Sequence, residues 1–319
     1  MKVHIFNPEN DLALADGRPG YTAPASARQM RKELHWLPEW WAEEGDLVWD
    51  GESSLQLQEG DEICPWGWSP ALIHQLKQAG VADSLLPTPE QMDHLRWLSH
   101  RQTAVEALAQ MRADRLLGET LCGASRECKC TAEVSEALAQ WPRTLFKAPW
   151  SCSGKGLVAS DAPDCDRRVE HIMQQQGSVI AEQMLHKITD FALEFMLDGN
   201  GGVEYQGLSL FHTNEAGAYT GNWLAPEPQK LAWLAQYADP RCLMDIRQWW
   251  EQYLRQFSYR GPVGIDMMLC HEGICPCVEI NWRMTMGMVG LFLTRQGRSG
   301  KLLIYYMYGH YVAEVEAFG

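Results

Sequence analysis

The clearest candidate chemistry lies in a predicted β-hairpin over residues 263–281. A two-residue turn at Glu272 and Gly273 would connect its two strands. Antiparallel pairing outward from this turn places Asp266 directly opposite Glu279. Two carboxylates that are separated in the chain are therefore predicted to meet on one face of the hairpin.

Asn281 and Arg283 extend this face, because side chains two residues apart on a strand point the same way. Two carboxylates and an amide oxygen are hard ligands of the kind that hold Mg²⁺ together with substrate phosphates. A guanidinium group beside them is suited to bind a phosphoryl group while it is being transferred. The alternative interpretation is a solvated strand face that carries charges.

A second candidate region follows a strand predicted at residues 144–147, which ends in Lys147. The loop after this strand is small and polar. Its backbone N–H groups are suited to phosphate oxygens, and Lys147 adds a point charge. The loop residues concerned are Ser151, Ser153, Gly154, Lys155 and Gly156. The alternative interpretation is a plain surface turn.

A third region is the apolar strand predicted at residues 178–182, which ends in the carboxylate of Glu182. The backbone beyond this strand, up to Leu185, could bind an adenine edge while an acid holds a hydroxyl group. The alternative interpretation is a buried strand end without a ligand.

Residues 1–90 alternate strands and helices, which predicts a small α/β domain. The expected strands are at 2–6 and 46–49, and the expected helices are at 24–35 and 69–79. A polar loop is predicted over residues 7–20. This loop follows the carboxyl end of the first strand, where such sheets bind ligands.

The loop over residues 7–20 carries Asn7, Asn10 and Asp11, which could bind the amino or carboxyl group of a substrate. An Asx-type turn is the alternative interpretation. Asn222, which follows a predicted strand, is a further candidate for the same cleft, with a simple loop as its alternative.

The rest of the chain mixes helical and strand patterns. Strands are predicted over 190–197 and 203–211. Helices are predicted over 89–111, 163–176 and 229–257, and across about the last forty residues.

Composition narrows the class of protein. The chain has 319 residues, a net charge of −14 and 46% hydrophobic residues, which predicts a folded protein of more than one domain. The acidic balance argues against nucleic acid as a partner, and no apolar run is long enough for a membrane span. The N-terminus lacks the apolar core of a signal peptide, so we expect a cytoplasmic protein whose ten cysteines are reduced thiols.

Together, in this order and spacing, the three regions resemble the ATP-grasp superfamily of carboxylate–amine ligases over roughly residues 90–290. The resemblance implies an α/β (α+β) ATP-grasp fold with an N-terminal Rossmann-like pre-ATP-grasp domain. The implied domains are residues 1–98 for this N-terminal domain, 99–185 for the small central lobe and 186–319 for the large C-terminal lobe.

The resemblance also implies roles for individual residues of the hairpin. Asp266, Glu279 and Asn281 match the family's metal-binding strands. The stretch from Glu279 to Arg283 resembles the family's E-x-N-x-R ending, with Trp282 where Pro is frequent. Arg283 is thereby implied to contact the transferring phosphoryl group or the acylphosphate.

Nucleotide-binding roles are implied at the other matching positions. Arg101 and Lys147 match cations that contact phosphate, the hinge Glu182–Leu185 matches the segment that holds adenine, and Asp190 matches the ribose-binding acid. The full implied set is Arg101, Lys147, Ser151, Ser153, Gly154, Lys155, Gly156, Glu182, Gln183, Met184, Leu185 and Asp190.

The implied activity requires ATP and Mg²⁺ (or Mn²⁺) and joins a carboxylate to an amine through an acylphosphate. The substrates would be small molecules or peptides that carry these groups, and a homodimer is a possible assembly. Two alternatives stay open. One is an ATP-dependent kinase on the same scaffold, and the other is a non-catalytic nucleotide-binding regulatory protein.

Overall fold

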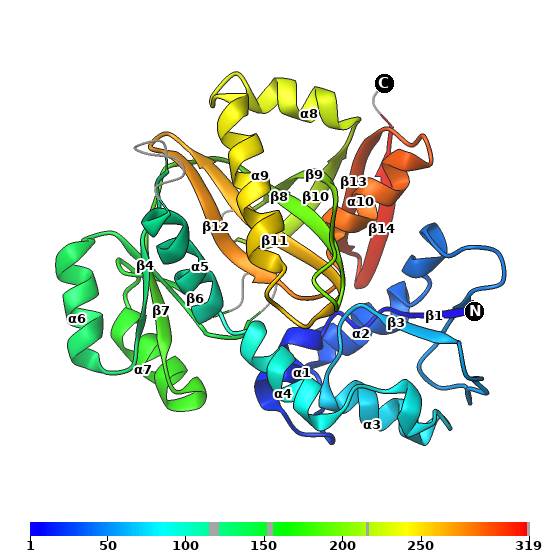
Figure 1. The fold of residues 1–319 in the computed structure, drawn as a ribbon. Coiled ribbons are helices and arrows are strands. Elements are labelled where there is room, and N and C mark those ends of the chain that lie inside the picture. The colour runs from blue at the N-terminus through cyan, green and yellow to red at the C-terminus, as the bar shows by residue number, and fades with distance from the viewer. Residues whose placement is uncertain (115–120, 152–155, 215–216, 318–319) are drawn as a thin grey trace.

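The computed structural model describes residues 1–114, 121–151, 156–214 and 217–317 (Figure 1). Its strands form three sheets, of three, four and seven strands, and the seven-stranded sheet lies in the middle. Each sheet falls within one of the three predicted domain ranges, whereas the domain boundaries themselves stay a prediction. Across the described residues, none of the helices combines the length and the apolarity of a membrane span.

The N-terminal sheet is parallel and has the strand order β2-β1-β3. Its strands are β1 (Lys2–Ile5), β2 (Leu47–Val48) and β3 (Glu62–Pro65), and its helices are α1 (Asn10–Asp16), α2 (Ala25–Leu34) and α3 (Pro70–Gln78). Val3 and Ile5 share a buried core with Leu72 and Leu76 of α3. Because β1 lies between β2 and β3, the loops after β1 and β3 come together at the carboxyl end of the sheet.

The loop predicted over residues 7–20 was only partly correct, because the segment contains α1. Ala13 and Leu14 bury the apolar side of this helix, and Gly17 ends it with a left-handed backbone (φ 74°). The Asn, Asp and Gly residues that suggested a loop lie mostly at the two ends of the helix. Local polarity therefore hid a short helix whose stability comes from packing.

The second sheet has the strand order β4-β7-β5-β6 and is antiparallel. Its strands are β4 (Ser125–Cys128), β5 (Thr144–Lys147), β6 (Leu157–Ala159) and β7 (Val179–Gln183), and its helices are α6 (Thr131–Gln140) and α7 (Cys165–Gln176). Phe146 and Ala181 are buried with Ala137 of α6 and Val169 of α7. This packing positions the ends of β5 and β7, where the candidate nucleotide residues lie.

The helix predicted over residues 89–111 is two helices, α4 (Pro89–Leu98) and α5 (Gln102–Ala113). Thr103 explains the break, because its hydroxyl donates to the Leu98 and His100 carbonyls, both at 2.9 Å. The Leu98 carbonyl would otherwise accept a backbone N–H group in a continuous helix, whereas the His100 carbonyl accepts the Thr103 N–H as well, at 3.0 Å. The break places Arg101 at the start of α5.

The third sheet has the strand order β12-β11-β8-β9-β10-β13-β14. Its strands are β8 (Lys187–Asp198), β9 (Val203–Thr213), β10 (Tyr219–Leu224), β11 (Arg260–Cys270), β12 (Gly273–Asn281), β13 (Gly300–Met307) and β14 (His310–Glu316). The segment 229–257 forms two helices rather than one, α8 (Glu227–Leu234) and α9 (Pro240–Leu254). Trp250 of α9 packs with Phe191 and Phe195, so α9 covers one face of the sheet (Figure 1).

The helical prediction for about the last forty residues was wrong beyond α10 (Met286–Arg295), because β13 and β14 form a hairpin there. β13 pairs with β10, and Leu302 lies opposite Asn222 and is fully buried. β13 is a strand because it pairs with β10, some eighty positions earlier in the chain, and local periodicity cannot reveal so distant a partner.

The hairpin of β11 and β12 has the predicted pairing but not the predicted turn. Cys270 pairs with Gly273, so the turn residues are His271 and Glu272. The register then shifts between Met268, which pairs with Cys275, and Asp266, which pairs with Glu279. This bulge lengthens β12 by two residues relative to β11 and restores the predicted face, because the side-chain period of a strand is two.

Gly67 of the loop after β3 provides a test of how the two carboxyl-end loops pack. A Cβ atom at this position would lie 2.3 Å from Cγ of Asn10. We expect Gly67→Ala to lower the free energy of unfolding by about 1–3 kcal/mol, measured by urea titration. Gly20→Ala is the matched control, since no atom lies within 4 Å of its added Cβ. Equal stability of the two variants would contradict this packing.

Candidate functional site

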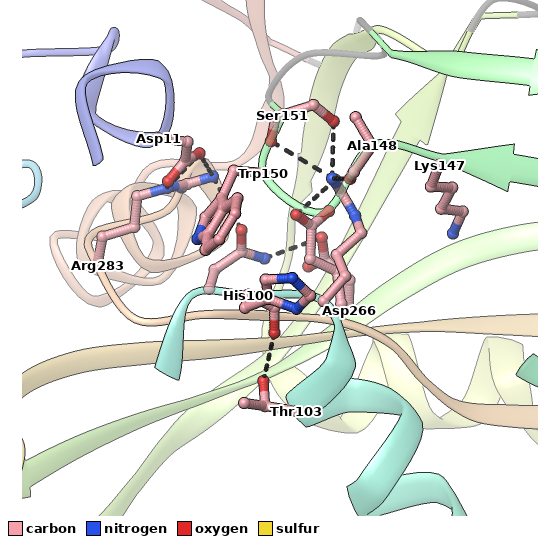
Figure 2. A network of polar contacts seen from close by, with 12 residues as sticks. Asp11, His100, Thr103, Lys147, Ala148, Trp150, Ser151, Asp266 and Arg283 are labelled. Carbon is pink, nitrogen blue, oxygen red and sulfur yellow. Dashed lines mark hydrogen bonds and ion pairs between the residues drawn. The ribbon is translucent and has the colours of Figure 1, made fainter. Parts of the chain in front are cut away.

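Two carboxylates and an amide meet at the predicted metal site (Figure 2). Asp266 on β11 lies opposite Glu279 on β12, and Asn281 Nδ2 donates to Asp266 Oδ2 at 3.0 Å. The alternate residues Ile265 and Ile280 belong to the core under α9. The three polar side chains therefore lie on the opposite face of the sheet.

Arg101 joins this cluster to the loop after β5. Its Nη2 lies 2.6 Å from Glu279 Oε1, and its Nη1 donates to the Ala148 carbonyl and to Ser151 Oγ, both at 2.7 Å. Both Arg101 and Ser151 are buried. A guanidinium group from the small lobe is thus held directly against a candidate metal ligand of the large lobe.

Lys147 and Glu182 form a second ion pair, with Lys147 Nζ 2.5 Å from Glu182 Oε2. They lie on the neighbouring strands β5 and β7, and Lys147 is only 6% exposed. Gln183 ends β7, and Met184 and Leu185 follow it as the predicted hinge. The strand pairing thus places the predicted phosphate-binding cation beside the predicted hinge.

Asp190 takes part in a third polar cluster at the start of β8. Lys187 Nζ lies 2.6 Å from Asp190 Oδ2, and the Thr213 hydroxyl donates to the same oxygen at 2.7 Å. The predicted site did not include Lys187 or Thr213. Lys187 lies three residues before Asp190 on β8, a spacing that a regular strand would put on opposite faces, and the register shift at Lys187 changes this. Thr213 comes from the neighbouring strand β9.

Arg283 connects the metal cluster to the N-terminal sheet. Its Nη2 donates to Asn281 Oδ1 at 2.8 Å, and its Nε donates to both carboxylate oxygens of Asp11, at 3.0 and 3.1 Å. Met284, the next residue, donates its N–H to the Trp66 carbonyl at 2.8 Å. Figure 2 shows Asp11 and Arg283 facing each other at the edge of this network.

The other predicted substrate residues have structural partners. Asn7 Nδ2 donates to the Gly67 carbonyl at 2.8 Å, and Asn10 Nδ2 donates to Asp11 Oδ1 at 3.1 Å. Asn222 is buried on β10, where its Nδ2 donates to Ser209 Oγ at 2.5 Å and its Oδ1 accepts from Tyr219. Of these candidates, Asp11 alone is joined to the cluster of candidate metal ligands by a described contact.

The predicted phosphate loop is described only at its two ends. Ser153, Gly154 and Lys155 lie outside the described residues, and Ser151 and Gly156 flank them. Gly156 has a left-handed backbone (φ 76°), and its carbonyl accepts the Ala148 N–H at 2.9 Å. The two ends of the loop are therefore held together beside Arg101.

Glu194 on β8 is a buried carboxyl group that was absent from the predicted site. Burial, followed by the nearby charge of Asp266, raises the pKa of Glu194 to about 8. Burial, followed by the charge of Glu279, likewise raises the pKa of Asp266 to about 7. A glutamate inside an otherwise apolar strand, four residues after Asp190 and hence on the same face, was the available signal.

A large crevice reaches this site from the side of the N-terminal sheet. It has a volume of about 1570 Å³, and its lining includes Trp66, Gly67, Tyr259, Arg283 and Met284. Arg283 therefore has the candidate metal ligands on one side and an open crevice on the other.

The cysteines contribute no second metal centre within the described part of the chain. No group of three His, Cys, Asp or Glu side chains is arranged there to hold a metal, and no disulfide joins the described cysteines. The candidate metal site therefore depends on two carboxylates together with the amide of Asn281.

These three sheets, with Arg101 of the part that carries the four-stranded sheet paired to Glu279 of the seven-stranded one, form an ATP-grasp fold, and the predicted fold class is confirmed. The solved structure of N5-carboxyaminoimidazole synthetase from Staphylococcus aureus, complexed with ADP, aligns with a TM-score of 0.51 and 12% identity over 93% of this chain and 78% of that one. Biotin carboxylase from Campylobacter jejuni aligns with a TM-score of 0.51 and 11% identity, over 93% of this chain and 71% of that one.

Pyruvate carboxylase from Rhizobium etli aligns with a TM-score of 0.55 and 13% identity, over 95% of this chain and 31% of that longer one. No protein-family model matches the sequence. A curated protein that matches in sequence, lysine-specific demethylase 3A of Mus musculus, is 25% identical over 182 residues. That match covers 53% of this chain and 13% of the demethylase, so it carries no functional argument.

The raised pKa values of Asp266 and Glu194 predict how stability depends on pH. Their ordinary values are 3.8 and 4.5, and the folded values are about 7 and about 8. Between about pH 4 and pH 8 the folded protein therefore binds more protons at these groups than the unfolded chain does, so they make stability fall as pH rises.

We expect Asp266→Asn and Glu194→Gln each to flatten this fall, because each replaces a titrating acid by a neutral amide. The measurement is the free energy of unfolding in urea, with a chelator present, at several values between pH 5 and pH 8. Wild-type pH slopes in both variants would show that the two carboxyls titrate normally in the folded protein.

Proposed function

We propose that the protein is an ATP- and Mg²⁺-dependent ligase that joins a carboxylate to an amine through an acylphosphate. The observation that carries this proposal is the convergence of Asp266, Glu279 and Asn281 on one face of the hairpin, with Arg283 beside them. This set lies in the cleft of an ATP-grasp fold. The aligned synthetase from Staphylococcus aureus was crystallised with ADP, which supports ATP as the nucleotide.

The donor set fits Mg²⁺. Asp266 and Glu279 offer carboxylate oxygens, Asn281 offers an amide oxygen, and such hard ligands suit Mg²⁺ shared with phosphates. Burial and the charge of Glu279 raise the pKa of Asp266, and a bound cation would lower this pKa again. Bound there, the ion would offset negative charge on the phosphates of ATP.

The remaining cations and acids of the cleft would bind the nucleotide. Lys147 and Arg101 are already desolvated and close to the two ends of the Ser151–Gly156 loop, so they are placed to neutralise phosphate oxygens. Glu182 and Asp190 would bind the adenosine part. In the structure each of the four is paired with an opposite charge, so nucleotide binding would exchange these partners.

Arg283 would act between the nucleotide and the second substrate. A substrate carboxylate oxygen attacks the γ-phosphorus of ATP, the bond to the bridging oxygen breaks, and ADP leaves. The amine nitrogen then attacks the acyl carbon and loses a proton, while inorganic phosphate leaves with the electrons of the C–O bond. A fixed guanidinium group stabilises the charge that develops on the phosphoryl oxygens in both steps.

The crevice beside Arg283 supplies a route for the two substrates, which are small molecules or peptides. Asp11, which accepts from Arg283 of the crevice lining, is the group that we assign to the amine, because its carboxylate can hold a cationic nitrogen next to Arg283.

Loss of the metal ligand Glu279 should abolish turnover. We expect Glu279→Ala to reduce Mg²⁺-dependent ADP release by about a hundredfold or more, because charge on the phosphates is no longer offset. ADP release is measured in a coupled assay, and circular dichroism checks the fold. Glu59→Ala, an exposed glutamate, is the matched control. Unchanged turnover in Glu279→Ala would remove the metal assignment.

Trapping of the intermediate separates the ligase from a kinase. With hydroxylamine as the nucleophile and a panel of carboxylic acids, a ligase should yield a hydroxamate in amounts equal to the ADP released. The hydroxamate is measured as its coloured ferric complex. A stable phosphorylated product without hydroxamate would instead identify a kinase, and ATP binding without any turnover would identify a regulatory protein.

A further inference from the structure

Glu194 has no role in the chemistry described so far, although it lies on the same face of the sheet as Asp266. It is on β8, opposite Gly264 of β11, one step along the same face from the pair of Ala192 and Asp266. The side chain is 1% exposed. A carboxyl group buried this deeply is costly, so its retention calls for a specific contact.

Two glycines make the room that this carboxyl group occupies. A Cβ atom on Gly287 would lie 2.0 Å from Glu194 Oε1, and a Cβ atom on Gly264 would lie 2.8 Å from Glu194 Oε2. Any other residue at position 287 would collide with the carboxyl oxygen. Glycines on β11 and in the first turn of α10 thus leave the space that the Glu194 side chain occupies.

The contact that Glu194 makes is with Thr285, the N-cap residue of α10. The Thr285 hydroxyl donates to Glu194 Oε1 at 2.9 Å and accepts the N–H of Met288 at 3.0 Å. The Thr285 hydroxyl group therefore connects the first turn of α10 to Glu194 on β8. The other carboxyl oxygen, Oε2, has no partner among the described residues.

Thr285, which makes this contact, lies two residues after Arg283 in the chain. Arg283 Nη1 donates to the Met284 carbonyl at 3.0 Å, so the guanidinium group is oriented by the same segment that Thr285 anchors. Position matters here, because a shift of about 1 Å in a group near the reacting atoms costs about a hundredfold in rate.

We propose that Glu194 is a positioning residue: through Thr285 it fixes the start of α10 and thereby holds Arg283 in register with Asn281 and Asp11. This inference rests on the proposed function, because Arg283 must act on the reacting groups for its position to matter. An apolar side chain of similar size would be cheaper to bury than a carboxyl group, so stability alone does not explain Glu194.

The test compares Glu194→Leu, which removes the acceptor, with Glu194→Gln, which keeps an amide oxygen for Thr285. We expect Glu194→Leu to stay folded and to lower kcat for ADP release by about tenfold to a hundredfold, with KM for ATP unchanged. Glu194→Gln should recover most of kcat. Wild-type kcat in Glu194→Leu would overturn the proposal, and so would a Glu194→Gln variant as slow as Glu194→Leu.

Thr285 provides a second pair of variants that does not alter the buried acid. Thr285→Val removes the donor and should lower kcat like Glu194→Leu, whereas Thr285→Ser keeps the hydroxyl group and should retain kcat. The double variant Glu194→Leu with Thr285→Val should be no slower than either single variant, because both break the same contact. Additive losses would overturn the proposal, and so would wild-type kcat in Thr285→Val, even if Glu194→Leu alone failed to fold.

A wild-type protein without ATP turnover would refute the proposed function but would leave this contact testable. Amide hydrogen exchange over residues 282–289 reports the anchoring of the segment without any activity. We expect faster exchange there in Glu194→Leu and Thr285→Val, and wild-type exchange in Thr285→Ser. Equal exchange in all four proteins would overturn the inference by itself.

Discussion

Charges that leave water must find partners, and this constraint shapes the whole cleft. Arg101 meets Glu279, Lys147 meets Glu182, and Arg283 meets Asp11, in each case from a different part of the chain. Removing one member would strand the other in a buried place, which costs far more than the pair contributes. The pairs Arg101–Glu279 and Arg283–Asp11 therefore join the small lobe and the N-terminal sheet to the large lobe, whereas Lys147–Glu182 lies within the small lobe.

The same constraint makes the site ready for a charged ligand. Each cation already sits in a poorly solvated position, so phosphate oxygens need not displace much water to reach it. The acids that now balance these cations include the candidate metal ligands. Under the proposed function, a metal ion with a polyphosphate would replace both halves of this charge balance at once, so an acidic chain could hold an anionic nucleotide.

Prediction from the sequence succeeded where both residues of a contact lie in one short stretch of the chain. The pairing of Asp266 with Glu279 depends only on one hairpin, and it survived a misplaced turn because the bulge in β12 offsets the register displacement of two residues. Prediction failed for β13 and β14, whose partner strand is distant. It also missed Thr213, Glu194 and the partners of Arg101, because these contacts cross between strands or lobes.

Short stretches of the sequence determine the types and the order of the reactive groups. They therefore also determine the kind of chemistry that these groups can perform. Alternation within a strand and spacing within a hairpin are short-range relations, and they assign Asp266, Glu279 and Asn281 to one face. Which acid balances which cation was decided by the assembled sheets alone. Asp11 reaches Arg283 because the carboxyl end of a parallel sheet packs against the end of β12, a long-range contact that no periodicity encodes.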